Sequence, residues 1–169
     1  LGRALCRVQD HAMPFTMTPP AQEMFDILGR ESSFGYKVLF ANLWCFRPLL
    51  NLVCRMSGGE LNALVRTTCA LTMAEGSKAY NVLPSNAKAG VNLRLISGDT
   101  IEQACDRLRK IINDPNVDVR FVTGENPSAV SVTGDEPWNR LKQAIGAAYP
   151  GVLVSPYLML AGRDSRRYC

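Results

Sequence analysis

Residues 80–100 read YNVLPSNAKAGVNLRLISGDT, and the part from 86 to 95 alternates strictly between two kinds of side chain. The first set is apolar and comprises Ala87, Ala89, Val91, Leu93 and Leu95. The second set is polar and comprises Asn86, Lys88, Asn92 and Arg94, with Gly90 leaving a gap in its middle. A period of two residues with one apolar face is typical of a strand in an antiparallel sheet that is buried on one side. This stretch therefore predicts such a strand, with Arg94 on its solvated face.

The neighbouring segments indicate the fold class to which this strand belongs. Period-two alternation also runs from Leu64 to Met73, with Val65, Cys69, Leu71 and Met73 on one face and Arg66, Thr68 and Thr72 on the other. A capping box formed by Thr100 and Gln103 then opens a helix. Its core stripe comprises Ile101, Ala104, Cys105, Leu108, Ile111 and Ile112. Alternation at Val117, Val119 and Phe121 predicts one more strand. The order predicts an α+β fold, an antiparallel sheet with helices on one face.

The first third of the chain has helical patterns. Apolar residues at helical spacing begin at Leu1, and a second helix starts at Thr18-Pro19-Pro20 and ends at Gly29. Residues 37–56 are apolar almost all round, but Arg47 and Pro48 at the centre argue against a membrane span. We expect a helix, or a helix pair broken at Pro48, buried between elements or subunits. Its apolar residues Leu39, Phe40, Leu43 and Trp44 predict self-association.

The composition changes to that of a loop at residues 124–136, which suggests a domain boundary. A helical pattern follows up to Pro150, and then the continuous apolar run VLVSPYLML (152–160) predicts a buried parallel strand. We expect a first domain at 1–125, with a helical insert at about 19–57, and a partial α/β segment at 126–169. The chain starts inside a helical pattern without methionine, which predicts a piece of a longer protein.

The composition limits the classes of function. The 169 residues are 47% hydrophobic and 20% charged, and the net charge of +4 is not gathered into a basic run. The solvated face of the 86–96 strand has no aromatic residue for base stacking, so a nucleic-acid partner is not expected. No membrane partner is expected either. The six cysteines form no Cys-x-x-Cys motif and are interpreted as small buried hydrophobes. One histidine, His11, is too few for an ordinary catalytic zinc site.

Two motifs carry a resemblance to a known family. Residues 73–100, MAEGSKAYNVLPSNAKAGVNLRLISGDT, resemble the signature of the lid, or dimerisation, domain of the zinc-dependent "M-twenty" exopeptidases, which include aminoacylase, succinyl-diaminopimelate desuccinylase and carboxypeptidase S. The matching residues are Lys78, Asn81, Val82, Leu83, Pro84, Asn92, Arg94, Gly98 and Asp99, with Ser97 where proline is common. The segment AGRDSRRY (161–168) is similar to the family's Gly-Gly-Thr-Asp-Ser-Arg, with Arg163 in place of threonine. The insert containing ANLW and NALVRTT is most similar to the carboxypeptidase S branch.

The resemblance implies a function and site residues. It implies a ferredoxin-like lid, the dimerisation domain of a zinc-dependent hydrolase that cleaves peptide or N-acyl-amino-acid amide bonds, and a homodimer formed through the lid. Asn81 matches a lid asparagine that helps to hold the scissile carbonyl or the substrate, Arg94 matches the lid arginine, and Arg166 matches an arginine near the terminal carboxylate of the substrate. A guanidinium suits a carboxylate and an amide N–H suits an oxyanion. The ordinary alternatives are a solvated strand arginine and a turn asparagine.

The departures from the family pattern are equally informative. The metal-binding His-x-Asp, the Glu-Glu pair and the later histidine are absent from the sequence, and His11 does not match the lid histidine. We therefore predict no catalytic residue and no zinc ligand in this chain, and we expect the chain alone to be inactive. The alternative is a free-standing dimerisation or binding module without catalysis. A reading frame that extends into the metal-binding motifs on both sides would favour the hydrolase.

Overall fold

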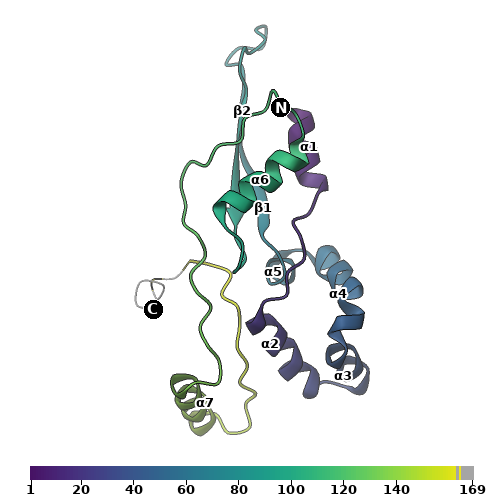
Figure 1. The fold of residues 1–169 in the computed structure, drawn as a ribbon, viewed down its shortest axis with the longest axis vertical. Coiled ribbons are helices and arrows are strands. Elements are labelled where there is room, and N and C mark those ends of the chain that lie inside the picture. The colour runs from purple at the N-terminus through teal and green to yellow at the C-terminus, as the bar shows by residue number, and fades with distance from the viewer. Residues whose placement is uncertain (163, 165–169) are drawn as a thin grey trace. The chain divides into compact units, whose positions relative to one another are not determined.

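The structure is a computed structural model that describes residues 1–162 and residue 164. Its contacts divide the chain into two compact units (Figure 1). The first, called the sheet unit, consists of Leu1–Pro14 and Arg66–Pro127. The second, called the helical unit, consists of Phe15–Val65 and the segment from Ser128 onward.

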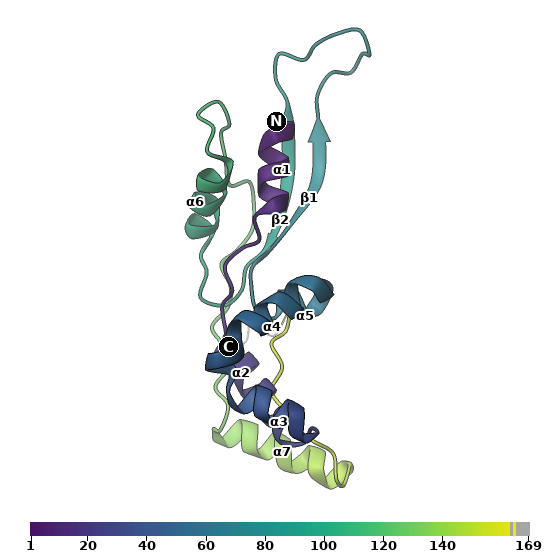
Figure 2. The ribbon, with the colours of Figure 1, turned by 90° about the vertical axis from the view of Figure 1, so that its right-hand side faces the viewer.

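The sheet unit has the fold class that the sequence predicts. Strands β1 (Thr68–Glu75) and β2 (Lys88–Arg94) pair antiparallel. Helices α1 (Gly2–Asp10) and α6 (Ile101–Ile112) contact each other and lie beside this hairpin (Figure 2). Their buried core comprises Ala4, Val8, Met13, Leu108 and Ile112, and Cys69 and Leu93 of the sheet pack against it. The predicted α+β class, with helices on one face of an antiparallel sheet, is confirmed.

The predicted alternation holds along β2 but fails in the middle of β1. Leu71 pairs with Val91, whereas Met73 pairs with Gly90, so the register shifts by one residue between them. Such a bulge moves every later side chain of β1 to the other face. Met73 therefore lies opposite Gly90, on the other face of the sheet from Cys69. A Cβ atom at position 90 would lie 3.0 Å from the Cβ of Met73, which explains the glycine.

The third predicted strand, at residues 117–121, is wrong. Val117 and Val119 still pack against the core of the sheet unit, but their backbone joins no strand. The carbonyl of Val119 accepts a hydrogen bond of 2.8 Å from the guanidinium of Arg109. A side chain of α6 thus occupies an acceptor that a neighbouring strand would use. The capping box that opens α6 is confirmed, with both hydrogen bonds between Thr100 and Gln103 present.

The helical unit contains α2 (Pro19–Arg30), α3 (Phe34–Ala41), α4 (Leu43–Ser57), α5 (Gly59–Ala63) and α7 (Glu136–Ala148). Its core comprises Ala21, Met24, Phe25, Leu50, Cys54, Leu64 and Val65. Gly29 does not end α2 as predicted, because the helix continues to Arg30. This glycine instead lets α3 approach, since a Cβ there would lie 2.5 Å from the Cβ of Phe40. The ring of Phe40 in turn stacks on Phe25, with 5.6 Å between the ring centroids.

The apolar helix pair differs from its prediction in two ways. It is broken at Asn42, whose side chain donates to the carbonyl of Val38 over 2.8 Å, and Pro48 lies inside α4. Asparagine competes with helical backbone bonds in this way, which explains a break there. The pair is also exposed over most of its length rather than buried. Among the described residues no single helix is long and apolar enough to cross a membrane, and α3 with α4, bent by 106°, passes that test of length and composition only as a pair.

The predicted parallel strand at 152–160 is also wrong, because the structure has no strand there. Pro156 lies at the middle of the run and lacks the N–H group that a sheet requires. Pro156 is buried, and Leu158 and Leu160 pack against the core of the helical unit. The apolar residues are thus used for packing in an irregular conformation.

Candidate functional site

Arg94 is the last residue of β2 and lies opposite Thr68, the first residue of β1. Its side chain is exposed, as are those of Lys88 and Asn92 on the same face of the strand. Val91 and Leu93 on the other face are half-buried. The predicted position of Arg94 on the solvated face is therefore confirmed. An exposed guanidinium at a strand end can form a two-point contact with a carboxylate from outside the sheet.

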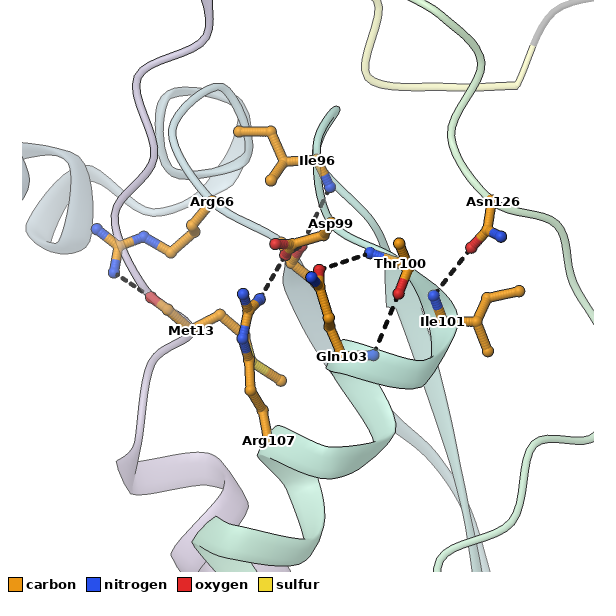
Figure 3. A network of polar contacts seen from close by, with 10 residues as sticks. Met13, Arg66, Ile96, Asp99, Thr100, Ile101, Gln103, Arg107 and Asn126 are labelled. Atoms are coloured by element: carbon orange, nitrogen blue, oxygen red, sulfur yellow. Dashed lines mark hydrogen bonds and ion pairs between the residues drawn. The ribbon is translucent and has the colours of Figure 1, made fainter.

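A buried polar network fixes the end of the hairpin that carries Arg94 (Figure 3). The carboxylate of Asp99, which is 8% exposed, accepts hydrogen bonds of 2.5 Å from the Thr67 hydroxyl and 2.6 Å from the Arg107 guanidinium. The same hydroxyl of Thr67 accepts the N–H of Ile96 over 3.1 Å. The residue before β1, the loop after β2 and helix α6 are thus joined at one point.

The sequence did not predict this network. Asp99 is one of the matching residues of the resemblance, but the sequence assigns it no role. Its contact residues Thr67 and Arg107 come from different sequence segments, so only the folded chain reveals them. A buried carboxylate that forms an ion pair and accepts a further hydrogen bond holds the groups that donate to it in one arrangement. Asp99 is therefore a structural residue of the sheet unit.

Asn81 lies in the connection between the two strands, which runs from residue 76 to residue 87. The whole connection is exposed. Inside it, the Ser77 hydroxyl bonds both the N–H and the carbonyl of Ala79, and the N–H of Val82 donates to the carbonyl of Ala79 over 3.4 Å. This last bond closes a turn in which Asn81 is the third residue, a position that asparagine accepts readily. The side chains of Tyr80 and Leu83 beside it are also exposed.

Asn81 and Arg94 lie at opposite ends of the hairpin. Both views show the 76–87 connection at the far tip of the strands, beyond Lys88 (Figures 1 and 2). From Lys88 to Arg94 the chain makes six strand steps, or about 20 Å at the usual rise. One copy of the chain therefore does not bring these two predicted site residues together.

Of the three predicted site residues, Arg166 remains, and two further residues that the sequence analysis names are Arg163 and His11. Arg166 and Arg163 lie outside the described residues. His11 is an exposed helix-end residue whose ring contacts the carbonyl of Arg7 over 2.7 Å. Across residues 1–162 and 164, no group of three or more His, Cys, Asp or Glu side chains could hold a metal ion. The described residues thus do not fit a zinc site.

The cysteines of the described chain are free thiols, and their burial varies. Cys54 is buried, Cys69 and Cys105 are half-buried, and Cys6 and Cys45 are exposed, so the prediction of buried thiols holds for only part of the set. Burial raises the pKa of the Cys69 thiol, which lies on the covered face of β1. A raised pKa keeps this thiol neutral and poorly nucleophilic.

Comparison with known proteins identifies the class. The family model of the peptidase dimerisation domain matches residues 8–120, which is most of the chain and includes β1, β2 and α6. The chain belongs to this family, and the resemblance to the lid of the "M-twenty" peptidases is confirmed. No solved structure matches the chain.

The similar curated proteins are hydrolases with carboxypeptidase-like or acyl-amino-acid names. The "Probable carboxypeptidase S-like 2" of Dictyostelium discoideum is 37% identical over 169 residues, covering 99% of this chain and 32% of the relative. An "N-fatty-acyl-amino acid synthase/hydrolase" of Danio rerio is 31% identical, covering 99% of this chain and 33% of the relative. Its human counterpart is 28% identical over 98% of this chain and 34% of its own length. The chain spans about a third of the length of these relatives.

Proposed function

We propose that this chain is the lid and dimerisation part of a metal-dependent hydrolase that cleaves the amide bond of a peptide or an N-acyl amino acid. The observation that carries the proposal is the family match over residues 8–120, which includes the hairpin with Asn81 and Arg94. The names of the relatives supply the two substrate classes, because they describe carboxypeptidase-like and N-fatty-acyl-amino-acid enzymes. A free carboxylate is present in both classes of substrate, and Arg94 is a suitable partner for it.

The metal of such an enzyme is proposed to be zinc and to be held by residues outside the described part of this chain. The proposal is supported by the described residues, among which no group of three or more His, Cys, Asp or Glu side chains could hold a metal ion. We assign the first 125 residues to the lid, with its helical insert at about 19–57, and residues 126–169 to the return into a catalytic domain. Helix α7 agrees with that assignment, because none of its residues is buried in this chain.

Asn81 and Arg94 are proposed to contact substrate from two copies of the lid. The scissile carbonyl and the carboxylate of a terminal amino acid are separated by only a few bonds. Two groups about 20 Å apart on one hairpin do not reach both at once. In a homodimer with two-fold symmetry, the tip of one hairpin and the base of another can serve the same site. The dimerisation-domain family makes a homodimer the expected assembly.

The experiment that tests the proposal uses the purified 169-residue chain with zinc. We expect no release of amino acid from an acyl-amino acid or a dipeptide, together with a dimer in sedimentation. The full-length enzyme that carries this chain is expected to hydrolyse one of these substrates. Hydrolysis by the 169-residue chain that depends on zinc would contradict the assignment of the metal to other residues. A strict monomer at high concentration would contradict the dimerisation role and favour a simple binding module.

A further inference from the structure

Arg94 lies where a hairpin by itself holds the chain least. Its side chain is exposed, and it is the last residue of β2 that pairs with β1. Among the described residues the sheet consists of these two strands. A two-stranded hairpin is only marginally stable alone, and the ends of its strands open most readily. A precise contact made by Arg94 therefore needs support from beyond the end of the strand.

The link between the two strands continues past Arg94 through a side chain. The hydroxyl of Thr67, the residue before β1, accepts the N–H of Ile96 over 3.1 Å. Both residues are buried, with Thr67 1% and Ile96 4% exposed. An N–H group left unpaired in the core is costly, so this bond opposes opening of the strand end. The backbone of Arg94 is thus held by its pairing with Thr68 and, two residues later, by a buried bond.

A tight turn connects this bond to a carboxylate. The N–H of Asp99 donates to the carbonyl of Ile96 over 3.0 Å, which closes a turn over residues 96–99. The third residue of the turn is Gly98, whose φ of +98° is a conformation that favours glycine. The turn brings the carboxylate of Asp99 back to the hydroxyl of Thr67, which donates to it over 2.5 Å. One hydroxyl therefore joins both ends of the turn.

Helix α6 anchors the carboxylate from a third direction. The guanidinium of Arg107 donates to Asp99 over 2.6 Å (Figure 3). The helix itself is fixed in the core, where Ala104 is 1% and Leu108 is 5% exposed. Apolar residues of the same volume often stabilise a core as well as a buried ion pair does. What the ion pair and its hydrogen bonds add is a single geometry for the segments that they join.

We propose that Thr67, Asp99 and Arg107 are positioning residues that hold Arg94 where it contacts the carboxylate of the substrate. They act through the backbone of residues 94–96 and do not reach the substrate themselves. The displacement of a substrate-binding group by about 1 Å can cost roughly 10²-fold in rate. The inference rests on the proposed function, because it requires Arg94 to bind substrate. It adds to the structural role of the network a role in the reaction.

The test compares two substrates of the full-length enzyme that carries this chain. One is an N-acyl amino acid, and the other is the same compound with its carboxylate converted into an uncharged amide. Release of the acyl group gives kcat/KM for each, and the ratio of the two values measures the contact with the carboxylate. An unfolded fraction of the enzyme lowers both values equally and cancels in the ratio. A residue that acts only on folding therefore leaves the ratio unchanged.

Arg94→Ala should lower this ratio roughly 10²-fold, as expected for the loss of a group that binds charge. Thr67→Val keeps the shape of the side chain but removes the bridging hydroxyl, and it should lower the ratio about tenfold. Thr67→Ser retains the hydroxyl and should retain the ratio. Thr72→Val is the matched control on the same strand, because the exposed hydroxyl of Thr72 donates to the carbonyl of Gly90 over 3.4 Å, away from the network. It should leave the ratio unchanged.

A double variant shows whether the network acts through Arg94. In an enzyme that already carries Arg94→Ala, the further change Thr67→Val should leave the ratio within about twofold, because the residue through which it acts is gone. Arg107→Gln removes the ion pair from the side of α6 and should give the same pattern. It decides the matter if Thr67→Val does not fold.

Three results would overturn the proposal. In the first, Arg94→Ala lowers the ratio but Thr67→Val and Arg107→Gln do not, so that the network is structural alone and Arg94 keeps its role. In the second, Thr67→Val lowers the ratio equally with and without Arg94, so that it acts by another route. In the third, Arg94→Ala leaves the ratio unchanged, which removes the proposed role of Arg94 and the positioning role with it.

Discussion

Asn81 and Arg94 lie on one hairpin but at its opposite ends, separated by the length of β2. Asn81 is in the exposed turn at the tip, and Arg94 pairs with Thr68 at the base. The base is held by the Asp99 network, whereas the hydrogen bonds that the described residues form within the tip are local ones around Ser77 and Ala79. The two residues therefore differ both in position and in how firmly the fold holds them.

The first prediction concerns Arg94. In the full-length enzyme, Arg94→Ala should lower kcat/KM by a factor that corresponds to about 2–4 kcal/mol, if the guanidinium stabilises charge in the transition state. The melting temperature should barely change, because exposed substitutions usually cost less than about 0.5 kcal/mol. Arg94→Lys should restore activity only in part, since the planar fork is lost. Kinetics and thermal unfolding measured on the same samples check this prediction.

Lys88→Ala is the matched control for Arg94, because Lys88 is exposed on the same face of β2. It should leave both kcat/KM and the melting temperature unchanged. An Arg94→Ala enzyme with full activity, or a loss of activity explained by unfolding, would make Arg94 an ordinary surface residue.

The second prediction concerns the buried network of the sheet unit. Asp99→Asn leaves the Arg107 guanidinium without its carboxylate and weakens the bond to Thr67. We expect the free energy of unfolding to fall by about 2–4 kcal/mol, as for other buried pairs that lose one member. Asp106→Asn removes an exposed carboxylate that pairs with Arg109 and should cost less than about 1 kcal/mol. Urea unfolding of the two variants of the 169-residue chain gives the comparison. Equal losses in the free energy of unfolding would show that the Asp99 network does not stabilise the sheet unit more than an exposed ion pair does.

The third prediction concerns the contact between α2 and α3. Gly29→Ala places a Cβ 2.5 Å from the Cβ of Phe40, so one of the two helices has to shift. We expect a loss of about 1–3 kcal/mol, typical of an overpacked site. Gly35→Ala on α3 has nothing within 4 Å of its new Cβ and should be neutral or stabilising. Both are measured by denaturant unfolding, and a neutral Gly29→Ala would refute the close approach of the helices.

The sequence was sufficient to predict the fold class and the position of Arg94, because both depend on local patterns. The alternation along β2 places Arg94 outward, and the Thr100–Gln103 box starts α6. The face of the sheet on which Met73 lies could not be predicted, because a single extra residue in β1 moves its side chain to the other face without any change in composition. The 117–121 and 152–160 segments have apolar residues suited to strands, but a strand also needs a partner edge, which a one-dimensional pattern does not show. The separation of Asn81 from Arg94 follows only from the length of the hairpin.

The measurement that tests the account most directly mixes two full-length variants, Asn81→Ala and Arg94→Ala, each of which is expected to have lost most of its activity. If the two residues act on one substrate from different copies, a mixed dimer has one site with both residues intact and one site with neither. Random exchange of subunits then makes half of the dimers mixed, so activity should return to about a quarter of that of the unsubstituted enzyme. If both residues served the same site from one copy, every site in a mixed dimer would lack one of them. No recovery after verified subunit exchange would contradict the proposal of a lid shared between two copies.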